Sequence, residues 1–142
     1  MQLKPYPKFE KKAEEYFLSG YNDAETILKV ILEHLGEEDP KFIKIATGLG
    51  AGLGRLGETC GAVTGGILAI SYKFGRVSKT EDKWHCYELI RKFIKEFRGK
   101  FGTIKCSDLR GGFDKDRKVC VPYIIYAVRL VINIIENSIN AN

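Results

Sequence analysis

The sequence predicts an all-α protein, a single-domain bundle of about five or six helices over residues 1–142. Three observations support this fold class. Apolar residues recur at helical spacing in several segments, glycine or proline separates these segments, and no part of the chain requires a strand. At 44% hydrophobic residues, 142 residues contain enough apolar material for one core and do not need a second domain.

The first half of the chain contains three predicted helices. An amphipathic segment over residues 8–18 is the first. The second follows Asn22, which can form a capping box with Glu25 three residues later. Asp23 then lies at the N-terminal end of the face that this helix turns toward the core. A short third helix is expected over residues 39–45.

The second half adds two long helices, over residues 60–74 and 80–97, and a loop or single helical turn within residues 103–112. Pro122 fits the first turn of a last helix that continues to about residue 135. This last helix is apolar nearly all round. It therefore lies either at the centre of the bundle or in the interface of a homodimer.

Charge and apolar patterning exclude two classes of partner. The formal net charge is +5, but basic and acidic residues alternate without a basic block, so nucleic-acid binding is not expected. The apolar run over residues 61–70 is too short for a membrane span, and the run over residues 121–135 is short and carries Arg129. The residues after Met1 lack the pattern of a secretory signal, so we expect a cytoplasmic protein without a membrane span.

Glycines are concentrated in the middle of the chain. Residues 52–57 match GxGxxG, which would indicate dinucleotide binding if a strand preceded it. Residues 42–46 are the candidate strand, but the later segments have helical patterns, and nucleotide binding is therefore the weaker alternative. Gly61 and Gly65 lie four residues apart and permit close contact between two helices.

Four cysteines are present, and no two are spaced as CxxC, which removes the usual zinc-ribbon and thioredoxin-like signatures. Cys60 follows Thr59, a good N-cap, and should lie in the first turn of a helix. Cys120 also precedes a helix, and Cys106 lies in a glycine-flanked turn. Helix N-termini stabilise thiolates, so we expect lowered thiol pKa values here. Cys86 is expected to be buried as a small apolar residue.

These cysteines and their surroundings resemble the C_GCAxxG_C_C family, which is described as redox-active and carries a CGAxxG motif. The matching segments are residues 20–25 (GYNDAE), 60–65 (CGAVTG), 97–109 and Cys120. By this resemblance Cys60, Cys106 and Cys120 correspond to the last three of four family cysteines. Asp23 stands where the family has the first cysteine, and Cys86 is at no family position.

The resemblance implies a shared cofactor site. A related segment occurs in split-Soret cytochromes, where the cysteines look like iron–sulfur ligands. The expected cofactor is accordingly an iron–sulfur cluster for electron transfer, with zinc less expected. A carboxylate oxygen can bind one iron in place of a thiolate. The implied cofactor-binding residues are Cys60, Cys106, Cys120, Gly61 and Gly65, and the implied metal ligands are Cys60, Cys106, Cys120 and Asp23.

Two alternatives remain open. One is a thiol-disulfide oxidoreductase or redox sensor in which Cys106 and Cys120 form a reversible disulfide. The other is a metal-free or zinc-stabilised helical module that dimerises through the last helix. The resemblance implies no established reaction, substrate or redox partner protein.

Overall fold

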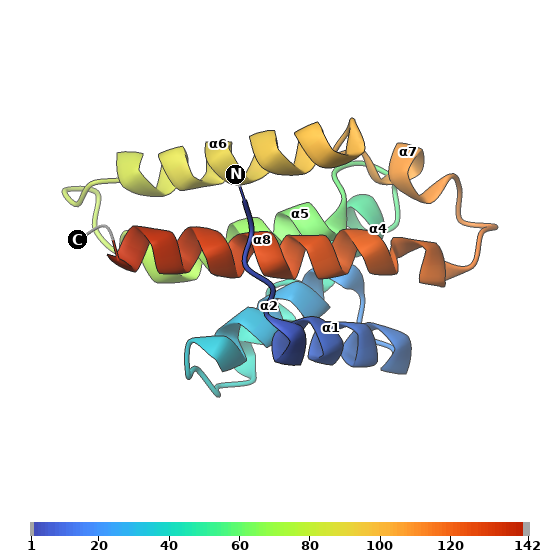
Figure 1. Ribbon diagram of the computed structural model, residues 1–142, viewed down its shortest axis with the longest axis horizontal. Helices are drawn as coiled ribbons and strands as arrows, with labels where there is room; N and C mark the ends of the chain where they lie inside the picture. The colour runs from blue at the N-terminus through green and yellow to red at the C-terminus, as the bar shows by residue number, and fades with distance from the viewer. Residues whose placement is uncertain (1, 141–142) are drawn as a thin grey trace.

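The computed structural model describes residues 2–140, and it confirms the all-α prediction (Figure 1). Five long helices form the bundle: α1 (Pro7–Ser19), α2 (Asp23–His34), α5 (Gly61–Phe74), α6 (Trp84–Phe101) and α8 (Val121–Asn140). Shorter helices connect them: α3 (Lys41–Lys44), η1 (Thr47–Leu49), α4 (Gly50–Leu53), α7 (Cys106–Arg110) and η2 (Arg117–Cys120). These short helices were expected only in part, so the total is larger than five or six.

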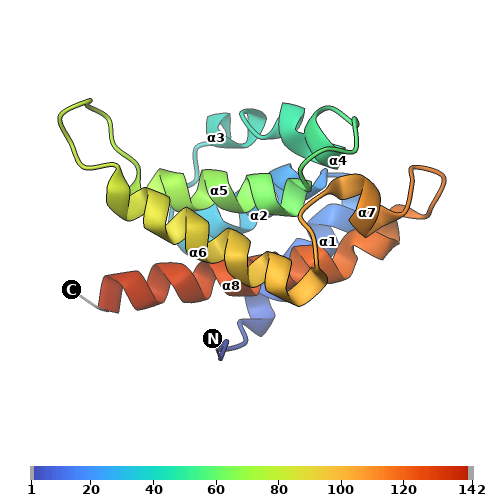
Figure 2. The ribbon, with the colours of Figure 1, turned by 90° about the horizontal axis from the view of Figure 1, so that it is seen from above.

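Helix α8 lies at the centre of the bundle, which is one of the two positions that its all-round apolar pattern predicted. It packs against α1, α2, α5 and α6, and most of its apolar side chains are buried (Figures 1 and 2). A homodimer through this helix stays a prediction. By length and composition alone the segment Arg117–Asn140 could cross a membrane, but core helices of soluble proteins pass the same test, and half of the segment's most apolar window is buried here.

The segment that sequence analysis considered as a strand before GxGxxG is helical. Residues 41–44 form α3, and the structure contains no strand within residues 2–140, only an isolated bridge between Thr59 and Lys105. A dinucleotide-binding βαβ unit is therefore absent from the described part of the chain. The strand considered over residues 42–46 is therefore wrong, and the GxGxxG match lacks the strand that a dinucleotide-binding motif needs.

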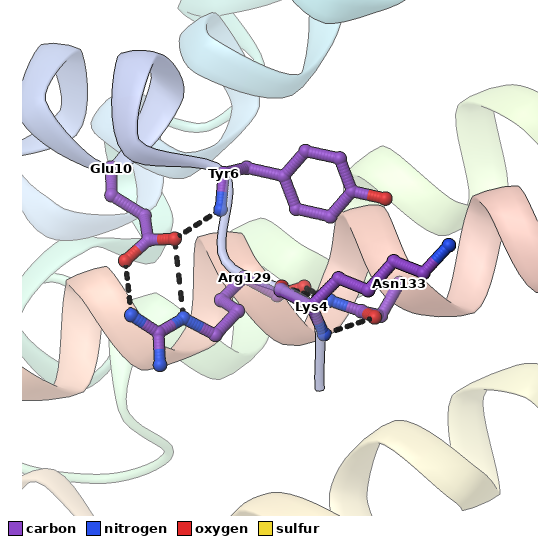
Figure 3. A network of polar contacts seen from close by, with 5 residues as sticks. All are labelled: Lys4, Tyr6, Glu10, Arg129 and Asn133. Atoms are coloured by element: carbon purple, nitrogen blue, oxygen red, sulfur yellow. Dashed lines mark hydrogen bonds and ion pairs between the residues drawn. The ribbon is translucent and has the colours of Figure 1, made fainter. Parts of the chain in front are cut away.

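The N-terminal arm is fastened to α8 by a small polar network (Figure 3). Glu10 is only 8% exposed and accepts hydrogen bonds from Arg129 at 2.6 and 3.1 Å and from the Tyr6 amide at 2.6 Å. The side chain of Asn133 accepts from the Lys4 amide at 2.9 Å and donates to the Lys4 carbonyl at 2.8 Å. The bonds of Arg129 and Asn133 join residues more than a hundred positions apart and fix the N-terminal arm and α1 against the central helix.

Replacing Arg129, whose guanidinium group binds Glu10, should lower the free energy of unfolding by an amount that depends on pH. Burial favours the neutral form of Glu10, but the hydrogen bonds from Arg129 and Tyr6 outweigh it and lower the Glu10 pKa. The stabilisation is therefore complete above the ordinary glutamate pKa and is lost as pH falls through the lowered value, below about pH 4. We expect Arg129→Met to cost roughly 2 kcal/mol at pH 7 and much less at pH 3, measured by urea unfolding.

The exposed pair between Lys41 and Asp39, with 3.8 Å between its charged atoms, provides the control. Lys41→Met should change the free energy of unfolding by less than about 0.5 kcal/mol at either pH. Equal costs for Arg129→Met at pH 7 and pH 3 would show that the side chain stabilises through packing and not through its charge.

Candidate thiol and carboxylate site

One end of the bundle gathers Asp23, Cys60, Cys106 and Cys120, which we call the thiol site. Each of the four belongs to a different element: Asp23 is the first residue of α2, Cys60 precedes α5, Cys106 begins α7 and Cys120 ends η2. Asp23, Cys106 and Cys120 line one cavity of about 130 Å³. Asp23, Cys60 and Cys106 are buried, at 7%, 5% and 4% exposure, whereas Cys120 is half-buried.

A two-residue bridge sets Cys60 and Cys106 side by side. Thr59 pairs with Lys105 in antiparallel orientation, the Cys60 amide donates to the Ile104 carbonyl at 2.7 Å, and the Cys106 amide donates to the Glu58 carbonyl at 2.6 Å. Side chains alternate between the two faces of extended backbone. Because Thr59 and Lys105 share one face, Cys60 and Cys106 share the other, as a diagonal pair within reach of each other.

The carboxylate of Asp23 lies between the glycine-rich segment and the start of α5. Its Oδ1 accepts from the Ala51 amide at 3.1 Å and from the Ala24 amide at 3.0 Å. Burial raises the pKa of Asp23, and the hydrogen bonds from the amides of Ala51, Ala24 and Gly61 offset this only in part. Asp23 is thus a buried carboxyl group in this site, held by backbone amides.

The two motif glycines allow α2 and α5 to approach closely, as the sequence predicted. A Cβ at Gly61 would lie 2.5 Å from Oδ2 of Asp23 and closer still to Oδ1. A Cβ at Gly65 would lie 2.7 Å from the Ala24 carbonyl oxygen and 2.9 Å from the Cβ of Ile27. Gly61 therefore makes room for the Asp23 side chain, and Gly65 makes room for the backbone of α2.

A left-handed turn covers the thiol site. Ala51, Gly52, Leu53, Gly54 and Arg55 all have positive φ, between 54° and 75°. Three of them carry side chains, and each such residue costs about 1–2 kcal/mol in this conformation. The Ala51 amide that binds Asp23 belongs to this turn. Sustained strain of this kind clusters at functional sites, which makes the turn part of the site and not a simple connection.

The turn also lies directly on Cys106. A Cβ at Gly52 would be 2.7 Å from the Cβ of Cys106 and 2.5 Å from the Glu58 amide nitrogen. No side chain fits there. Glycine at this position therefore permits both the positive φ and the contact with the cysteine.

Two arginines line the cavity beside the cysteines. Arg117 donates to the carbonyls of Phe17 and Tyr21 and lies over the Phe17 ring, 3.9 Å from its centroid. Arg110 donates to the carbonyls of Gly112 and Lys115 at 3.3 Å. Both guanidinium groups are thus held in place by backbone carbonyls and bring positive charge to the site.

The pKa of Cys60 is raised, and the expectation of a lowered value is wrong. Burial, followed by the negative charge of Asp23, raises the pKa of Cys60 to about 12. The amides of Ala62 and Val63 lower it, as a helix N-terminus should, but they do not offset the burial. Cys60, and not Thr59, occupies the N-cap position of α5.

The pKa values of the other two thiols, Cys106 and Cys120, are also raised. Burial, and then the charge of Asp23, raise the pKa of Cys106 and raise that of Cys120 to about 11. Arg110 lowers both values, and Arg117 also lowers that of Cys120, without reversing the shift. Without a bound cation all three thiols are therefore protonated at neutral pH.

Two further observations concern possible metal ligands and the fourth cysteine, Cys86. Among residues 2–140, no three His, Cys, Asp or Glu side chains lie close enough together to bind a single metal ion. Cys86 lies apart on α6, where it is buried as predicted, with its sulfur 3.8 Å from the Ser71 hydroxyl.

Sequence reasoning missed Ala51, Arg110, Arg117 and Ile104, whose carbonyl accepts a hydrogen bond from the Cys60 amide. The alternating glycines of residues 48–54 indicate an unusual backbone, but the sequence analysis interpreted this region only as a GxGxxG match. The positive φ at Ala51 has no sequence signal, because non-glycine residues rarely adopt it. The arginines follow ordinary loop residues and give no pattern.

One comparison with known proteins identifies a family. A family model described as "Putative redox-active protein (C_GCAxxG_C_C)" matches residues 21–134, which include all four residues of the thiol site. Neither the curated proteins nor the solved structures give a match. Since the matched region covers most of the sequence, the chain belongs to the C_GCAxxG_C_C family.

Proposed function

We propose that this redox-active protein carries an iron–sulfur cluster at the thiol site and transfers electrons through it. Cys60, Cys106 and Cys120 are its thiolate ligands, and Asp23 supplies a fourth, oxygen ligand. When bound, such a cluster accepts and releases single electrons. The protein's part is to hold the ligands, exclude water and balance charge.

The observation that carries the proposal is the position of Asp23 among all three cysteines. Its charge raises the pKa of Cys60, of Cys106 and of Cys120, although these residues belong to three different elements. The buried Asp23 carboxylate is costly unless something positive binds it, and deprotonating Cys60, Cys106 and the half-buried Cys120 beside it would add to that cost. A bound cation reverses this cost, because metal coordination deprotonates thiols.

A cluster and a single zinc ion need different donor spacings. A structural zinc site needs four ligands that converge on one point. The described residues contain no such group of three or more. Cys106 and Cys120 line one small cavity, and Cys60 and Cys106 flank the bridge between Thr59 and Lys105. Cluster ligands bind different irons, and so they need to surround a volume and not a point.

The surrounding residues have definable roles in this proposal. Arg110 and Arg117 place two positive charges against a thiolate-rich group, which stabilises its more reduced, more negative state. The amides of Ala51 and Ala24 orient the Asp23 carboxylate. An oxygen ligand binds iron more weakly than a thiolate does, so the Asp23 corner is the most exchangeable one.

The test is the iron and acid-labile sulfide content of the protein after anaerobic expression and purification. We expect both in similar amounts, together with visible absorption. Zinc, or no metal after anaerobic reconstitution with iron and sulfide, would overturn the proposal.

A thiol-disulfide function is the second candidate, because Cys106 and Cys120 line the same cavity. The raised thiol pKa values count against it, since a thiolate is the attacking form. A reversible disulfide would show a two-proton mass difference between the oxidised and reduced protein, mapped to this pair.

The rate of thiol alkylation can distinguish the cluster proposal from the thiol-disulfide function. Cys120 is half-buried, so its pKa limits its alkylation more than access does. In metal-free protein at pH 8, iodoacetamide should modify Cys120 at least about a hundredfold more slowly than in urea, and the rate should rise toward pH 11. Peptide mass spectrometry gives the rates. Rapid modification at pH 7 would instead favour the thiol-disulfide function.

A further inference from the structure

We infer that the left-handed turn and the basic residues beside it form the docking surface for an acidic electron-carrier protein. This inference rests on the proposed electron-transfer function. The docking surface consists of a turn part and a rim part. The turn part is Leu53, Arg55 and Leu56, and the rim part is Lys105, Arg110, Lys115, Arg117, Lys118 and Val119.

The turn part exposes two leucines beside the thiol site. Leu56 is 76% exposed and Leu53 is 37% exposed, and Leu53 is held at a positive φ of 65°. Glycine would adopt this conformation without strain, yet a large apolar side chain is placed there and directed outward. Neighbouring exposed apolar residues are typical of protein interaction sites. On the rim, Val119 adds a third, at 41% exposure.

The surface lies where an electron would have the shortest path out. The turn packs on Cys106 at Gly52, and Val119 and Lys118 directly precede Cys120. Figure 2 shows α4, α7 and the connection between α7 and α8 together at one end of the bundle. A partner on this end would approach the half-buried Cys120 without any rearrangement of the helices.

Arg55 and Arg110 join the two parts of the surface. Both lie over the ring of Phe113, with guanidinium carbons 4.9 and 5.0 Å from its centroid. Phe113 therefore makes cation–π contacts with two arginines from different segments. This stack fixes the loop after α7 against the left-handed turn, so the apolar and basic residues keep a constant relative position.

The charge of the surface selects an acidic partner. Six basic side chains border the site: Arg55, Lys105, Arg110, Lys115, Arg117 and Lys118. Four acidic side chains are nearby: Glu58, Asp108, Asp114 and Asp116. Asp116 already accepts a hydrogen bond from the Lys118 amide at 2.9 Å, and Asp108 accepts from Thr103 at 3.4 Å. The positive excess agrees with the net charge of +5 and steers an acidic carrier to this end.

The experiment measures binding of two probes by calorimetry, a ferredoxin of strongly negative charge and a cytochrome c of strongly positive charge. We expect the ferredoxin to bind at about 10 mM salt and to bind roughly tenfold more weakly at about 100 mM, because salt screens exposed charges. The double variant Lys115→Glu, Lys118→Glu should weaken binding at low salt by at least about tenfold. Leu56→Ser should weaken it with little change in salt dependence.

The matched control reverses two charges at the other end of the bundle. Lys73 lies in the last turn of α5, at the other end of this helix from Cys60. Lys79 lies in the exposed connection between α5 and α6, which Figure 2 shows at that end of the bundle. Lys73→Glu, Lys79→Glu changes the net charge equally and should alter binding by less than about twofold. Equal losses in both double variants, absence of ferredoxin binding, or preference for cytochrome c would overturn the docking surface.

The result of the binding experiment is independent of the result of the iron and sulfide measurement. Binding depends on surface side chains and is measured on the full chain both as purified and after removal of metal. Ferredoxin binding without any iron or sulfide would refute the cluster and leave the docking surface. A cluster-containing protein that binds no ferredoxin would refute the docking surface and leave the cluster.

Discussion

Replacing Cys60 by serine is expected to reduce iron and acid-labile sulfide in anaerobically purified protein at least about tenfold and to abolish visible absorption. Cys60 is 5% exposed, precedes α5 and is coupled electrostatically to Asp23 and Cys106. A serine hydroxyl is a harder and much less acidic ligand than a thiol. The bridge at Thr59 uses backbone atoms only, so the variant keeps its fold, which circular dichroism can verify.

Cys86→Ser is the matched control. Cys86 is buried to a similar extent, at 7% exposure, but it lies on α6 beside Ser71 and away from the other cysteines. Its replacement should leave iron, sulfide and colour unchanged. Equal losses in both variants, or no loss in either, would refute the assignment of the ligands.

Replacing Gly61 by alanine should destabilise the protein by roughly 3 kcal/mol in urea unfolding, because the new methyl group would overlap the Asp23 carboxylate. Asp23 is held by two backbone amides and cannot swing away without losing both hydrogen bonds. The variant should also lose iron, since relief of the clash moves the proposed fourth ligand.

A second substitution identifies the cause of this effect. The three atoms nearest to the added methyl group all belong to the Asp23 carboxylate, so Asp23→Ala should restore most of the stability lost in Gly61→Ala. Gly65→Ala is the control, because its methyl group would meet the Ala24 carbonyl, which Asp23→Ala does not remove. If Asp23→Ala rescued both variants equally, or neither, the proposed contact between Gly61 and Asp23 would be wrong.

The helical fold could be predicted because its determinants are local. Asn22 and Glu25 form the predicted capping box, with hydrogen bonds of 2.8 and 2.9 Å, and this fixes the start of α2. The same register places Asp23 on the buried face. Periodic apolar residues likewise gave every long helix, because burial of one face dominates helix stability.

The arrangement of the thiol site could not be predicted from such local patterns. The pairing of Thr59 with Lys105 joins two irregular segments through backbone hydrogen bonds, which side-chain identity does not encode. The prediction for the Cys60 pKa failed for a related reason. It considered the helix terminus but not the burial of the thiol or the negative charge of Asp23, and these two effects raise the pKa more than the helix terminus lowers it.

The distribution of the four site residues over α2, the start of α5, α7 and η2 has a consequence for biosynthesis. A ribosome delivers Asp23 early and Cys120 late, so a growing chain has an incomplete set of the proposed ligands until Cys120 has been added. Insertion of the proposed cluster would consequently need a chain that extends at least to Cys120, and a premature stop before Cys120 would leave a product that lacks one proposed ligand.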